Sequence, residues 1–78
     1  MEKLSQKTIL ITILVNGVPV AFDRHRVTGL QIKTKAGLDP NSELYGKTGE
    51  HLKLIGNEEE IEIHEEEEFV DYPPTPVS

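Results

Sequence analysis

The chain has 78 residues with a net charge of −6 at pH 7, 36% hydrophobic residues and no cysteine, which excludes disulfides, thiolate metal sites and a cysteine nucleophile. A chain of this length forms a single domain with a modest core. No apolar run approaches the roughly 20 residues that span a bilayer and no signal-peptide pattern follows Met1, so we expect a cytoplasmic protein with no membrane partner.

Residues 1–7 are polar and are predicted to be a flexible N-terminus that precedes a folded domain over residues 8–72. Asn16-Gly17 between two apolar runs is the strongest short signal for a two-residue β-hairpin. The register of this turn places six apolar side chains on one face of the sheet: Ile11, Ile13, Val15, Val18, Val20 and Phe22. Pro19 cannot donate a ladder hydrogen bond, so the second strand is expected at a sheet edge.

The first strand is apolar on its opposite face as well. Leu10, Thr12 and Leu14 alternate with the core-facing residues and therefore point away from the core. A strand that is apolar on both faces is usually central in its sheet. Two interpretations stay open: these side chains lie under a loop or a second layer, or they form an exposed patch that binds a partner.

A capped helix is predicted to follow the hairpin. Thr28 and Gln31 have the spacing of a capping box, and Val27 and Ile32 have the spacing of a hydrophobic staple. The helix is predicted to end at Gly37, because glycine readily adopts the left-handed cap conformation.

The side chains of this helix divide between the sheet and the helix end. Ile32 and Ala36 are four residues apart and are predicted to face the sheet. Lys33 and Lys35 lie near the C-terminus, where we expect them to interact favourably with the helix dipole. Residues 23–26, before the helix, are predicted to be a connecting loop.

The second half of the chain is predicted to contain short strands and turns. Strands are predicted at 43–46, 60–64 and 68–72, a strand or a 3₁₀ segment at 51–55, and turns at 47–49 and 65–66. The last strand is expected to pair in parallel with the first. This order predicts an α+β fold of the β-grasp type, with a mixed sheet of four to five strands packed on one helix. Residues 73–78 are rich in proline and are predicted to be an extended, disordered tail.

Charge is divided unevenly along the chain. Residues 1–40 contain six Lys/Arg and three Asp/Glu, whereas residues 41–78 contain two Lys/Arg and eleven Asp/Glu. Nucleic acid is therefore not an expected ligand, because phosphate binding needs clustered Lys and Arg. The glutamates at 58–60 and 65–68 suggest docking to a basic partner or cation binding, but we favour their usual role as a solvated surface that keeps strand edges from pairing.

No residue pattern indicates catalysis or metal binding. His25, His51 and His64 are scattered and lack the spacing of a ligand set, so neither a metal nor another cofactor is expected. The serines stand in no recognisable nucleophile context, and a small domain without a deep pocket is a poor scaffold for an enzyme. We therefore do not expect an enzyme.

Several motifs together resemble those of a known family. The helix, glycine cap and proline loop over residues 28–45 resemble those of ubiquitin. The chain is more similar to the bacterial multi-ubiquitin-like domains of the β-grasp class, which share three of its motifs: Val-Asn-Gly-x-Pro at Val15–Pro19, Ala-Gly-Leu at Ala36–Leu38, and a last strand with Phe69 that closes on Pro-Pro-Thr at Pro73–Thr75. The similarity covers about residues 8–75.

The resemblance implies a ubiquitin-like protein modifier of a bacterial conjugation pathway, in some cases linked to defence against phage. Its implied partners are an activating enzyme that adenylates a C-terminal carboxylate, a conjugating enzyme and a processing metalloprotease. Weak self-association is a further expectation. The alternatives are a β-grasp interaction module that is not conjugated and, with less support, a sulphur carrier.

One departure from the family of modifiers concerns the end of the domain. Modifiers and sulphur carriers normally end in Gly-Gly, which lets an enzyme approach the tail backbone closely, but no glycine follows Gly56 in this chain. Three outcomes stay open for the tail: it is trimmed, it is activated at a different residue, or it is never conjugated.

Two groups of residues are the candidate sites. The predicted partner-binding patch consists of Leu10, Thr12, Leu14 and Val70 on the sheet face opposite the helix, where ubiquitin-like proteins bind their partners. The predicted tail that enters an activating enzyme consists of Asp71, Tyr72, Pro73, Pro74, Thr75, Pro76, Val77 and Ser78.

Overall fold

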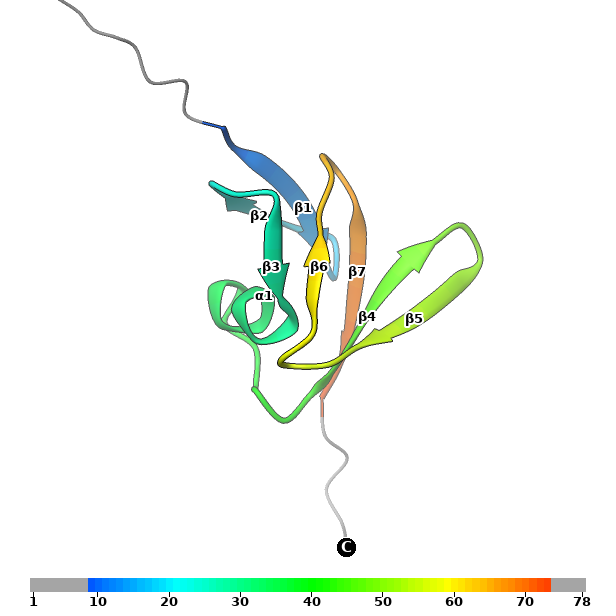
Figure 1. Cartoon of the computed structure of the whole chain (residues 1–78). Coiled ribbons are helices and arrows are strands. Elements are labelled where there is room, and N and C mark those ends of the chain that lie inside the picture. The colour runs from blue at the N-terminus through cyan, green and yellow to red at the C-terminus, as the bar shows by residue number, and fades with distance from the viewer. Residues whose placement is uncertain (1–8, 74–78) are drawn as a thin grey trace, which may run out of the picture.

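A computed structural model describes residues 9–73 of the chain (Figure 1). Its elements are, in order, β1 (Ile11–Val15), β2 (Val18–Phe22), β3 (Arg26–Thr28), α1 (Gly29–Ala36), β4 (Glu43–Thr48), β5 (His51–Ile55), β6 (Glu60–Glu62) and β7 (Glu68–Tyr72). Within the described residues, no helix is both long enough and apolar enough to cross a membrane.

Five strands form one mixed sheet in the order β2-β1-β7-β4-β5. β1 and β7 pair in parallel in its interior, as the sequence predicted, and the other neighbours are antiparallel. β2 lies at an edge, in agreement with Pro19. β3 and β6 form a separate two-stranded sheet, and the β4–β5 hairpin extends away from this small sheet and from α1 (Figure 1). The β-grasp prediction is confirmed.

The predicted hairpin register is confirmed, with Val15 opposite Val18 and Ile11 opposite Phe22. One core assignment was wrong: the side chain of Val18 is 59% exposed. Val18 lies on the expected face of the sheet, but it flanks the turn at the closed end of the hairpin, where the other layer does not cover it.

The helix boundaries follow from the predicted caps. The backbone N–H of Gln31 donates to Thr28 Oγ1 at 3.1 Å, and the backbone N–H of Thr28 donates to Gln31 Oε1 at 2.8 Å. At the other end Gly37 has φ of 75°, the left-handed conformation expected of a glycine cap.

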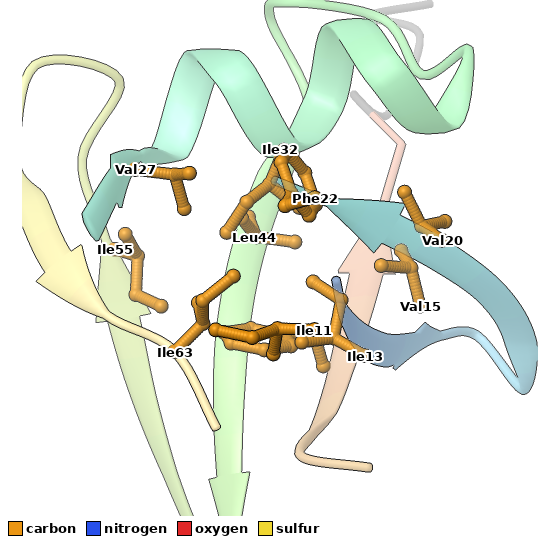
Figure 2. Packing of buried hydrophobic residues seen from close by; sticks show 11 residues of the cluster. Ile11, Ile13, Val15, Val20, Phe22, Val27, Ile32, Leu44, Ile55 and Ile63 are labelled. Carbon is orange, nitrogen blue, oxygen red and sulfur yellow. The ribbon is translucent and has the colours of Figure 1, made fainter. Parts of the chain in front are cut away.

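The core lies between the five-stranded sheet on one side and α1 with the small sheet on the other. Figure 2 shows Ile32 of α1 and Val27 of β3 directed toward side chains of the large sheet. The buried cluster consists of Ile11, Ile13, Val15, Val20, Phe22, Val27, Ile32, Leu44, Ile55, Ile63 and Phe69. Among the described residues, α1 and the small sheet therefore cover the same face of the five-stranded sheet.

Lys33 lies in the last turn of α1, as predicted, but its side chain is buried. Lys33 is only 3% exposed. Its Nζ atom donates to the backbone oxygens of Pro40 (3.3 Å) and Ser42 (2.5 Å) and to Oδ1 of Asn57 (2.6 Å). Lys33 therefore joins α1 to the loops before β4 and after β5.

The structure also changes several predicted boundaries, and the strand predicted at 60–64 ends at Glu62. The predicted loop at 23–26 ends one residue early, because Arg26 begins β3. The predicted turn at 47–49 is wrong, since Lys47 and Thr48 continue β4 and the chain reverses at Gly49-Glu50. Residues 51–55 form a strand rather than a 3₁₀ segment.

The predicted turn at 65–66 is present and contains a strained residue. Glu66 has φ of 64°, a left-handed conformation that costs a non-glycine residue about 1 kcal/mol or more. We expect Glu66→Gly to raise the free energy of unfolding by about 0.5–1 kcal/mol, measured by urea denaturation. Glu66→Ala is the control for lost charge, and equal stabilisation by both variants would contradict the backbone explanation.

Candidate partner-binding face

The face of the five-stranded sheet opposite α1, here called the outer face, presents side chains from all five strands. The register places Leu14 beside Pro19 and Glu68, Tyr45 beside Val70 and Leu54, and Lys47 beside Leu52. Because side chains directly opposite each other share one face of a sheet, these residues lie on one surface. Its apolar and aromatic members form the outer patch: Leu14, Tyr45, Leu52, Leu54, Val70 and Tyr72.

Two of the four predicted patch residues belong to this outer patch. Leu14 and Val70 line a common hollow of about 240 Å³. Thr12 is on the same face, but its backbone N–H donates to Glu65 Oε1 and its carbonyl accepts from the backbone N–H of Glu66, so the 65–66 turn lies beside it. Leu10 precedes β1 and is 62% exposed.

A second hollow continues the outer patch toward β5. Its volume is about 310 Å³, and Val70, Tyr72, Leu52 and Lys47 contribute to its lining. Val70 and Lys47 line both hollows. Leu52 and Leu54 are 48% and 53% exposed, and Tyr72 is 51% exposed. The outer patch is therefore continuous and open to solvent along β4, β5 and β7.

Two tyrosines of the outer patch contact each other. The rings of Tyr45 and Tyr72 meet edge to face, with their centroids 5.5 Å apart, an arrangement that favours aromatic pairs. The Tyr45 hydroxyl donates to Glu43 Oε1 at 3.0 Å. This hydrogen bond to a carboxylate stabilises the neutral phenol and raises the pKa of Tyr45 above its usual value.

The predicted last strand over residues 68–72 is confirmed. Asp71 and Tyr72, which were also predicted to begin the segment that enters an activating enzyme, are the last residues of β7. The backbone N–H of Asp71 donates to Asn16 Oδ1 at 2.9 Å. The Ser42 hydroxyl donates to Oδ1 of Asp71 at 2.5 Å. The strand is therefore held in place up to Tyr72, and Pro73 is the first tail residue. Pro74, Thr75, Pro76, Val77 and Ser78 lie outside the described residues.

Sequence reasoning missed Tyr45, Leu52 and Leu54 as members of this surface and treated Tyr72 as part of the tail. A usable signal was present: Leu52 and Leu54 alternate with His51 and Lys53, the pattern of a strand with one apolar face. The sequence alone does not distinguish a strand from a 3₁₀ segment at residues 51–55, so the face of these side chains could not be assigned. Among residues 9–73, no group of three or more His, Asp or Glu side chains is arranged to hold a metal ion.

The mixed sheet with parallel β1 and β7, crossed by one capped helix, defines a ubiquitin-like β-grasp domain. More particularly, the chain belongs to the multiubiquitin family, whose sequence model matches residues 11–70. No curated protein and no solved structure gives a significant match.

Proposed function

We propose that this chain is a ubiquitin-like protein modifier of a bacterial conjugation pathway, bound by an adenylating enzyme through the outer patch and the C-terminal tail. The adenylating enzyme would activate a carboxylate in or after the tail. A conjugating enzyme and a processing protease would act on the same chain in the cytoplasm.

The observation that best supports this proposal is the continuity of the outer patch with the start of the tail. Tyr72 is the last residue of β7, contacts Tyr45 within the outer patch, and is followed directly by Pro73. An enzyme that covers the outer patch would therefore hold the domain next to the segment that must enter its active site. Holding a reacting group in place lowers the entropic cost of the reaction.

A second candidate is an interaction module that is not conjugated. The observation in its favour is the run Pro73-Pro74-Thr75-Pro76 directly after β7. Proline rings prevent the close backbone approach that glycine permits. In this case the outer patch alone would bind a partner.

The test combines the purified chain, ATP and an adenylating enzyme encoded in the same genome, followed by intact-mass measurement. A modifier is expected to give an adenylate or an enzyme adduct, each dependent on ATP. A chain that binds the enzyme without any of these mass changes would support the interaction module. Absence of both a complex and a mass change would contradict the proposal.

A variant of the outer patch provides the second arm of the test. Leu52→Thr/Leu54→Thr removes exposed apolar surface but keeps residues that favour strands. We expect at least about tenfold weaker binding of the enzyme and a change in stability of less than about 1 kcal/mol. Ile9→Thr/Val18→Thr is the matched control, because these side chains are 48% and 59% exposed but lie outside the outer patch.

A further inference from the structure

The outer patch is bordered by carboxylates. Glu43 reaches the Tyr45 hydroxyl at 3.0 Å, and Glu50 lines the hollow that contains Leu52 and Tyr72. Glu68 is placed between Leu14 and Lys47 by the pairing of β7 with its two neighbours. We call Glu43, Glu50 and Glu68 the acidic rim.

Most Lys and Arg residues among residues 9–73 lie away from the outer patch. Among residues 9–73, Lys47 is the one Lys or Arg that lines the outer patch. Its Nζ atom lies 3.6 Å from Oε1 of Glu68, in an exposed ion pair. Lys53 lies on the other face of the sheet, because it pairs with Gly46 on β4. A Cβ atom at Gly46 would point toward the core residues Ile55 and Phe69. The other described bases are Arg24, Arg26, Lys33 and Lys35, between β2 and the end of α1.

An apolar surface with a charged rim selects its partner by charge. Complementary charges around an interface speed association and suppress wrong partners, whereas the apolar centre provides most of the affinity. A two-fold contact between two copies of this surface would place the two acidic rims near each other. The rim therefore disfavours a second copy as the occupant of the outer patch.

We infer that the outer patch binds a protein surface whose apolar centre is flanked by Lys and Arg side chains. This inference rests on the proposed function and adds the chemistry of the partner: the adenylating enzyme presents a basic docking surface to the domain. Glu43 and Glu50 interact with its bases directly, and Glu68 does so in competition with Lys47.

The test compares two triple variants with equal loss of charge. Glu43→Gln/Glu50→Gln/Glu68→Gln removes the acidic rim, and Glu58→Gln/Glu60→Gln/Glu62→Gln removes three glutamates from the segment around β6. Each triple includes one carboxylate in an exposed ion pair, Glu68 with Lys47 at 3.6 Å and Glu60 with Arg26 at 3.5 Å. Circular dichroism verifies that both variants are folded.

The association rate with the adenylating enzyme is measured by stopped flow between low and high salt. We expect the rim variant to associate roughly tenfold more slowly at low salt and to lose most of its salt dependence. The control variant should stay within about twofold of the wild-type chain.

Four outcomes would decide against the inference or its basis. Equal slowing of both variants would assign the effect to net charge, and an unchanged or faster rate of the rim variant would overturn the basic docking surface. A wild-type chain that sediments as a dimer, and loses the dimer in Leu52→Thr/Leu54→Thr, would assign the outer patch to a second copy. A wild-type chain that never binds the enzyme would instead reject the proposed function, and with it this inference.

Discussion

Gly29→Ala is expected to lower the free energy of unfolding by about 2–3 kcal/mol. Gly29 is the first residue of α1 and packs against the backbone after β5. A Cβ atom at this position would lie 2.3 Å from the carbonyl oxygen of Gly56 and 3.1 Å from Cγ2 of Ile55. The contact cannot open easily, because Leu30 donates its backbone N–H to Asn57 at 3.1 Å and Gly29 donates to Glu59 at 3.2 Å.

Gly56, the other glycine in this contact, provides the matched control. A Cβ atom on Gly56 would meet nothing closer than Cβ of Glu59, at 3.8 Å, which is an ordinary contact. Gly56→Ala should therefore change the stability by less than about 1 kcal/mol. Urea denaturation of both variants measures the difference, and equal losses would contradict a close approach at Gly29.

Lys33→Met is expected to lower the free energy of unfolding by about 2–4 kcal/mol. Methionine fills a similar volume but removes the donor to the Ser42 backbone oxygen and to Asn57 Oδ1, whereas the Pro40 oxygen keeps the side-chain N–H of Asn57 as a donor. Each buried acceptor without a donor costs about 1–3 kcal/mol, and the estimate allows for some of them to regain water. Thermal and urea unfolding measure the loss.

Lys35→Met is the control on the same helix. Lys35 is exposed, and its Nζ lies 5.4 Å from the centre of the Phe22 ring, a contact that contributes about 1 kcal/mol or less at an exposed site. A loss at Lys33 no larger than that at Lys35 would show that the buried hydrogen bonds do not stabilise the loops. Acetylation of the native chain gives an independent check, since Lys33 should react far more slowly than Lys35.

The fold could be predicted where local chemistry determines it. Asn16-Gly17 fixed the hairpin register, and Thr28 with Gln31 fixed the start of the helix, because both signals act within a few residues. The apolar character of β1 on both faces predicted its central position, and the order of the elements predicted its parallel pairing with β7.

Features that depend on distant segments could not be predicted in the same way. β3 has only three residues and becomes a strand by pairing with β6, and Lys33 is buried because two remote loops supply its acceptors. The close approach of Gly29 to Gly56 likewise leaves no trace in either local sequence.

The candidate site could be predicted only in part, because it also depends on the pairing of distant segments. Leu14 and Val70 were found from strand alternation and family resemblance. Tyr45, Leu52 and Leu54 joined them only after β4 and β5 were paired with each other and with β7. The tail residues from Pro74 onward stay a prediction.

The central claim is that the outer patch is the surface that the adenylating enzyme binds. It is tested most directly by methyl NMR of the chain, labelled at Leu and Val, as the unlabelled enzyme is added. We predict broadening or shifts of the Leu14, Leu52, Leu54 and Val70 methyl signals, with little change at Leu30. Perturbation of Leu30 and Val27, which line the hollow between β2 and α1, with no change in the four signals of the outer patch, would contradict the account.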